Sequence, residues 1–85
     1  MADIVIYTRR FCGYCDSARR LLKRKNAPFT ELDVSDDPGL RQAMVARSNG
    51  HRTLPQIFIG ETHVGGCDEL YDLEQAGGLD ALLVA

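Results

Sequence analysis

The pattern of apolar and polar residues in the first half of the chain predicts two strands separated by a helix. A continuous apolar run at residues 4–7 is typical of a strand that is buried on both faces. Over residues 14–25 the apolar positions recur every three and four residues, which predicts an amphipathic helix. Residues 26–28 contain a proline that ends this helix. Apolar and polar residues then alternate over residues 29–34, so we expect a second strand with one drier face.

The second half predicts a helix, a hairpin and a closing helical region. Acidic residues and a proline at 36–38 mark the start of a helix. The apolar run at 57–59 and the pair at 63–64 flank a tight turn, so these strands should pair as a hairpin. A further helix is expected over 67–76, stopped by two glycines, and residues 79–83 predict a short terminal helix.

This order of elements, β-α-β-α-β-β-α, predicts an α/β fold with a four-stranded mixed sheet. The first two strands are joined by a helix, so they should be parallel with a right-handed crossover. Helices are expected on both faces of the sheet. With 85 residues and no linker, repeat or low-complexity segment, residues 1–85 should form one domain.

Composition narrows the class of protein. The chain is 45% hydrophobic and 26% charged, which is ordinary for a globular domain. It has no apolar stretch of the ~18 residues that a membrane span needs, and its start lacks the features of a signal peptide. Three cysteines are too few for a secreted disulfide scaffold. We therefore expect a cytoplasmic protein without a membrane partner, in which a cysteine pair serves catalysis or metal binding.

Charge is distributed unevenly along the chain. Residues 1–25 carry seven bases and two acids, whereas residues 26–85 carry three bases and ten acids. Few aromatic residues accompany the basic cluster, and the overall pI of about 5.5 is low for a nucleic-acid-binding domain. We expect no nucleic-acid partner, and we interpret Lys23, Arg24 and Lys25 as a solvated helix face near a helix C-terminus.

The candidate chemistry is the pair Cys12 and Cys15, which lies where the first strand ends and the first helix begins. Free backbone N–H groups and the helix dipole stabilise a thiolate at such a position, and Arg9 and Arg10 add positive charge. These surroundings lower a cysteine pKa from about 8.5 to between ~3.5 and ~7.5. A low pKa also makes the thiolate a good leaving group. Cys12 should be the exposed, acidic member and Cys15 the buried one.

A zinc site is the alternative for these cysteines. It would need four ligands, for which Cys12, Cys15, Cys67 and one of two histidines would have to serve. Their spacing matches no second CxxC or HxxxH motif. We therefore expect no metal there, and we interpret His51 and His63 as surface histidines.

Three sequence blocks, "YTRRFCGYC", "RTLPQIFIG" and "HVGGCDEL", resemble the dithiol glutaredoxins in their order and spacing. The resemblance extends from Ile4 to Leu83. It implies a thioredoxin fold and an oxidoreductase that uses glutathione to reduce glutathione mixed disulfides and protein disulfides. Cys12 matches the nucleophilic cysteine of the family and Cys15 the resolving one.

The resemblance also implies a set of glutathione-binding residues. Pro55 matches a cis-proline, and the backbone of Leu54 matches the group that pairs with the cysteine of glutathione. The segment around Gly66 matches the part that holds the γ-glutamyl end, with Asp68 facing its ammonium group. From the residues alone, Pro55 would be a trans-proline at an edge strand, and Asp68 a helix cap. The implied set is Arg9, Tyr14, Arg41, Thr53, Leu54, Pro55, Gly66, Cys67 and Asp68.

Two departures from the family pattern keep alternatives open. Many dithiol relatives have proline where Gly13 stands, and some with a small residue there hold a [2Fe–2S] cluster between two subunits through the first cysteine and glutathione. The alternative is therefore a cluster-carrier dimer with Cys12 as ligand; otherwise we expect a monomer. Cys67 is interpreted as a small, partly buried residue. A thioredoxin-type protein is disfavoured because the chain has no tryptophan.

Overall fold

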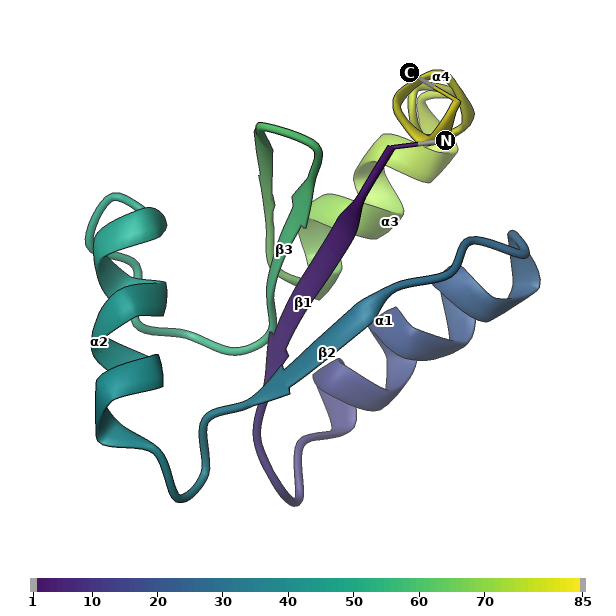
Figure 1. The fold of residues 1–85 in the computed structure, drawn as a ribbon. Helices are drawn as coiled ribbons and strands as arrows, with labels where there is room; N and C mark the ends of the chain where they lie inside the picture. Colours follow the sequence, from purple (N-terminus) through teal and green to yellow (C-terminus); the bar gives the residue numbers. More distant parts are fainter. Residues whose placement is uncertain (1, 85) are drawn as a thin grey trace.

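The computed structural model describes residues 2–84, so the outermost residues of the expected domain, Met1 and Ala85, lie outside the described residues. Figure 1 shows strands and helices in the predicted order. The elements are β1 (Ile4–Thr8), α1 (Gly13–Arg24), β2 (Thr30–Asp33), α2 (Pro38–Arg47), β3 (Gln56–Ile59), β4 (Thr62–Gly65), α3 (Cys67–Gln75) and α4 (Leu79–Leu83). Among residues 2–84, none of the helices has the length and apolar character that crossing a bilayer requires.

The four strands form one mixed sheet in the order β2-β1-β3-β4. β1 and β2 are parallel, as their connection through α1 requires, and both β1–β3 and β3–β4 are antiparallel. The predicted α/β fold with a four-stranded mixed sheet is therefore confirmed. The first helix begins one residue earlier than expected, at Gly13, because Cys12 serves as its N-cap.

Helices cover both faces of the sheet because its central strands are apolar on both sides. On one face, Ile6 and Ile57 pack with Leu22 of α1 and Leu70 of α3, and all four are fully buried. On the other face, a smaller cluster surrounds Met44 of α2 and comprises Tyr7, Val34, Met44 and Phe58. Figure 1 shows α2 on the side of the sheet opposite α1 and α3. Side chains alternate between the faces of a strand, which is why β1 contributes to both clusters.

Two strands differ from the sequence pattern. β2 is shorter than expected and three of its four residues are exposed, because it lies at the edge of the sheet. β4 is longer than expected and contains an irregularity, since Ile57 pairs with Gly65 whereas Phe58 pairs with His63. The extra residue places Gly65 at a φ of 113°, a left-handed conformation that favours glycine.

Three of the seven bases in the N-terminal region, Arg10, Arg19 and Lys25, form ion pairs with acidic residues that are distant in the sequence. Lys25 lies 2.8 Å from Glu74 and 2.9 Å from Asp80, so it is not part of a solvated helix face as predicted. Its pKa is raised by hydrogen bonds to these two carboxylates. Arg19 similarly contacts Glu31, at 2.6 Å. Folding therefore offsets part of the charge asymmetry that the sequence shows.

Candidate functional site

The cysteine pair lies at the junction between β1 and α1. The chain leaves β1, turns through Phe11 with a positive φ of 53°, and enters the helix with Cys12 as the N-cap. The backbone N–H of Cys15 donates a hydrogen bond to the Cys12 Sγ at 3.2 Å. This bond satisfies one of the free donors of the first helical turn and points a partial positive charge at the sulfur.

Cys12 and Cys15 form a disulfide in this structure. Their Cα atoms are 5.2 Å apart, a separation that a disulfide spans readily. Cys15 is fully buried, on the same side of α1 as Ala18 and Leu22, as expected. Cys12 is also buried, with only 6% of its surface exposed, so the expectation of an exposed Cys12 is wrong for the oxidised pair. Its sulfur is covered by Cys15 and by the Leu54 carbonyl oxygen, which lies 3.9 Å away.

Of the two arginines before the motif, one is paired with a carboxylate and the other is held by backbone carbonyls. Arg10 forms an ion pair with Asp36, and the hydrogen bonding and attraction between them raise the arginine pKa and lower that of the carboxyl. Arg9 instead donates to the carbonyls of Arg10 and Phe11, at 3.0 and 3.1 Å. The stabilisation of a Cys12 thiolate therefore rests first on the N-terminus of α1.

A groove beside the cysteines collects most of the sequence-predicted binding residues. It has a volume of about 360 Å³. Seven of the nine residues implied by the resemblance line it, together with one that was not predicted. The lining residues are Tyr14, Thr53, Leu54, Pro55, Gly66, Cys67, Asp68 and Glu69. Cys12 borders this groove through its contact with the Leu54 carbonyl.

The two long walls of the groove come from the loop before β3 and from the start of α3. The Leu54–Pro55 bond is cis, as the resemblance implied. Opposite it, a Cβ built on Gly66 would lie 3.4 Å from the Pro55 carbonyl oxygen. The same Cβ would lie only 3.2 Å from Glu69 Oε1, so a side chain at position 66 would crowd the cap of α3. Tyr71 fixes α3 against α1 by donating to the Ser17 carbonyl at 3.1 Å.

The N-terminus of α3 is capped by Glu69. Its Oε1 accepts a hydrogen bond from the Gly66 N–H at 2.7 Å. Asp68, for which the residues alone suggested a capping role, makes no hydrogen bond within residues 2–84 and is exposed at the groove. Cys67 is buried, and burial followed by the charges of Asp68 and Glu69 raises the pKa of its thiol. Its thiol is therefore held protonated, which suits the predicted role as a small, partly buried residue.

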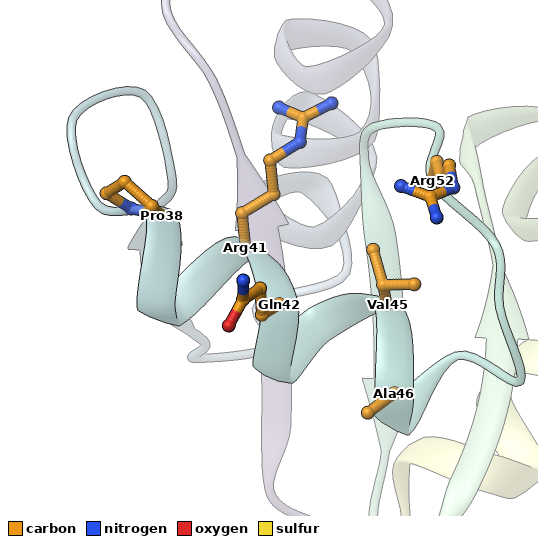
Figure 2. A pocket seen from close by; sticks show the side chains of 6 residues that line it. All are labelled: Pro38, Arg41, Gln42, Val45, Ala46 and Arg52. Carbon is orange, nitrogen blue, oxygen red and sulfur yellow. The ribbon is translucent and has the colours of Figure 1, made fainter.

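Arg41 lies outside this groove, and Arg9 does not line it. Arg41 lines a separate hollow of about 470 Å³ on α2, together with Arg52 of the following loop (Figure 2). Figure 2 also shows Gln42 and Val45 on the same helix. That hollow contains neither cysteine. The structure thus brings together seven predicted binding residues and leaves the two arginines apart from them.

Three supporting residues were missed by sequence reasoning: Glu69, Gln56 and His63. Glu69 follows Gly66 by three residues, which is capping-box spacing, so its role was open to prediction. Gln56 lies within an apolar strand and is only 2% exposed. His63 was expected at the surface, but it is half-buried and within hydrogen-bond distance of Gln56. The contact between Gln56 and His63 joins two neighbouring strands, and the apolar–polar pattern along one strand carries no information about such a contact.

Comparisons with known proteins place this geometry in context. The family model described as Glutaredoxin matches residues 4–64. A protein of Pseudomonas aeruginosa named Glutaredoxin is 55% identical over 85 residues, which are 100% of each chain. The solution structure of glutaredoxin from Brucella melitensis is 57% identical, with a TM-score of 0.85 over 98% of this chain and 89% of that one. The crystal structure of a buckwheat glutaredoxin–glutathione complex is 27% identical, with a TM-score of 0.88 over 98% of this chain and 77% of that one.

Proposed function

The chain belongs to the glutaredoxin family and is a thiol–disulfide oxidoreductase that works through a cysteine pair, and from this premise we propose that its reductant is glutathione. The observation that carries the proposal is the position of the Cys12 sulfur. It accepts a hydrogen bond from the first turn of α1 and lies 3.9 Å from the Leu54 carbonyl at the border of the groove. The buckwheat relative of the same fold is a glutathione complex.

In the proposed first step, the Cys12 thiolate attacks the glutathione sulfur of a mixed disulfide on a substrate protein. The bond between that sulfur and the substrate sulfur breaks, and the substrate leaves as a thiolate that takes up a proton. Cys12 is then joined to glutathione. The Cys15 N–H, which donates to Cys12 Sγ at 3.2 Å, stabilises the thiolate before attack and again when it leaves.

The groove offers complementary groups for glutathione. We assign the Leu54 backbone to the cysteinyl part, because it lies next to the Cys12 sulfur. The γ-glutamyl end is assigned to the start of α3, where free helix N–H groups donate to its carboxylate and the unpaired Asp68 accepts hydrogen bonds from its ammonium group. Tyr14, 66% exposed, covers the open side. We assign the glycyl carboxylate to Arg9 and Arg41. Both lie outside the groove, so this end of glutathione would extend beyond it.

Two routes complete the cycle. A second glutathione thiolate attacks the glutathione bound to Cys12, which forms oxidised glutathione and releases the Cys12 thiolate. With a protein disulfide as substrate, the Cys12 thiolate attacks one of its two sulfurs, and the other sulfur leaves as a thiolate that takes up a proton. The Cys15 thiolate then attacks the Cys12 sulfur, which breaks the bond between Cys12 and the substrate and releases the substrate as a dithiol. The product is the Cys12–Cys15 disulfide that this structure contains, and two glutathione molecules then reduce it.

The test is steady-state reduction of a glutathione mixed disulfide by excess glutathione, comparing the wild type with Cys12→Ser and Cys15→Ser. The proposal predicts no turnover for Cys12→Ser and most of the wild-type rate for Cys15→Ser. Reduction of a protein disulfide should instead need both cysteines. A wild type that turns over neither substrate would contradict the proposal.

The alternative is a carrier of a [2Fe–2S] cluster, which is held by four ligands. One chain would offer only Cys12, so a second chain and two external thiols would be needed. Anaerobic reconstitution with iron, sulfide and glutathione tests this, because only a cluster-bound dimer would be coloured. For the leading function we propose a monomer that acts on glutathionylated or disulfide-containing proteins in the cytoplasm.

A further inference from the structure

Behind the groove, Gln56 makes an unusual set of contacts for a residue in a buried strand. Its side-chain Nε2 donates to the Thr53 carbonyl oxygen at 2.9 Å and lies 3.1 Å from the Thr53 Oγ1. Because Nε2 serves Thr53, the Oε1 atom is the acceptor that remains. That oxygen lies 2.7 Å from the Nε2 of His63. Gln56 therefore links β4 to the loop that forms one wall of the groove.

His63 is itself held in place on β4. Its ring stacks on Phe58 with centroids 4.7 Å apart and lies 5.6 Å from the ring of His51. Since the Gln56 Oε1 can only accept, the His63 Nε2 carries a proton and donates it. Burial lowers the pKa of His63, with further lowering by His51 and Arg47 and an opposing effect of Glu69. The contact is therefore made by the neutral ring at neutral pH.

Because the peptide bond is planar, the contact between Gln56 and the Thr53 carbonyl also orients the backbone N–H of Leu54, a residue that lines the groove. The carbonyl of Thr53 and the N–H of Leu54 belong to one trans peptide unit, so they point in opposite directions. Fixing the Thr53 carbonyl toward Gln56 therefore fixes the Leu54 N–H away from Gln56. Within residues 2–84 the Leu54 N–H makes no hydrogen bond. It is thus an oriented donor without a partner, on a residue whose carbonyl oxygen lies 3.9 Å from the Cys12 sulfur and which lines the groove.

We propose that Gln56 and His63 are positioning residues, which hold the Thr53–Leu54 peptide so that the Leu54 N–H is presented to the substrate. This inference rests on the proposed function, since the substrate part that receives the hydrogen bond is the cysteinyl carbonyl of glutathione. A purely structural role would leave Gln56 important for stability alone. A positioning role adds an effect on substrate binding that leaves the reactivity of Cys12 unchanged.

The experiment compares Gln56→Met, which keeps the side-chain length but removes all three contacts, with Gln75→Met at the exposed end of α3. His63→Phe is added because it keeps an aromatic ring on Phe58 and removes only the donor to Gln56. With a glutathione mixed disulfide as substrate, we expect Gln56→Met to raise KM about fivefold to tenfold, the usual effect of losing one well-oriented hydrogen bond. The kcat and the rate of Cys12 alkylation across the pH range should stay within about twofold of the wild-type values. His63→Phe should raise KM by a smaller factor, and Gln75→Met should not change it.

An unchanged KM in Gln56→Met, with a wild type that is active, would overturn the inference and leave the proposed function intact. Equal losses in kcat and in the alkylation rate would also overturn it, because they would indicate general damage to the site. If the wild type itself does not turn over, the proposed function fails. The positioning role is then tested without substrate, by measuring the mobility of the Leu54 amide. The steady-state ¹⁵N heteronuclear NOE of the Leu54 amide should then fall in Gln56→Met, and an unchanged value would overturn the positioning role.

Discussion

Replacement of Gly13 by proline tests the local geometry that makes Cys12 a helix N-cap. Gly13 is the first residue of α1, where the backbone N–H has no partner within the helix. Proline fits such a position because it lacks that N–H and has a fixed helical φ. A Cβ at residue 13 meets no atom within 4 Å, so the first side-chain carbon of either replacement has space. The preceding residue, Cys12, has φ −120° and ψ 102°, an extended conformation compatible with a following proline.

The expected effect is an increase of about 1 kcal/mol in the free energy of unfolding. Substitutions by proline at compatible sites stabilise by roughly 0.4–1 kcal/mol because they restrict the unfolded chain. Since the residue replaced is glycine, the most flexible one, we expect a value near the top of this range. For a domain of this size, about 1 kcal/mol corresponds to a rise of roughly 4–8 °C in Tm. Gly13→Ala is the matched control, and it should stabilise by about half as much, since alanine restricts the unfolded chain less than proline does.

Urea unfolding of the reduced protein is the appropriate assay, because the disulfide already restricts this part of the oxidised unfolded chain. If Gly13→Pro were destabilised while Gly13→Ala was not, the N–H of Gly13 would have a partner and the N-cap geometry would be refuted. If both variants were destabilised, the space beside Gly13 would not be open.

Three further predictions concern the supports of the groove and its core. Glu69→Ala should lower stability by about 1 kcal/mol through loss of the bond to the Gly66 N–H, whereas Glu69→Gln, which keeps an acceptor, should lose less; chemical denaturation compares them. The depressed pKa of His63 means that protonation favours the unfolded chain, so wild-type stability should fall as the pH drops below about 6.5. Urea midpoints at about pH 7.5 and about pH 5 should show this fall diminished in His63→Phe, and an equal fall would count against it. Met44→Ala should cost about 2–5 kcal/mol because Met44 is fully buried under α2; a loss well below 1 kcal/mol would indicate that α2 is loosely packed.

The sequence was sufficient for the fold because each element has a clear local pattern. The apolar run of β1, the amphipathic repeat of α1 and the hairpin turn at Gly60 all reflect interactions close along the chain. The edge position of β2 is different, since it depends on which strands pair. The pattern of residues 29–34 predicted a strand there but did not show that most of it would be exposed.

For the candidate site, motif residues were predictable and their supports were not. Cys15 was expected to be buried because its place on the apolar side of a helix follows from spacing. The burial of Cys12 depends on the Leu54 carbonyl, which is 42 residues away in the sequence. The pairing of Arg10 with Asp36 likewise joins two separate loops. Contacts of this kind arise only from the assembled fold, so composition and spacing do not reveal them.

The central claim is that Cys12, and not Cys15 or Cys67, forms the mixed disulfide with glutathione that a second glutathione then releases. The most direct test is to incubate Cys15→Ser and Cys12→Ser with oxidised glutathione and to map the modified cysteine by peptide mass spectrometry. The account predicts that Cys15→Ser gains one glutathionyl group on Cys12, whereas Cys12→Ser gains none on the buried Cys15. Cys67 should remain unmodified in both variants because burial and the charges of Asp68 and Glu69 raise the pKa of its thiol and keep it protonated. A Cys15→Ser protein whose Cys12 stays free, or which is modified only at Cys67, would contradict the account.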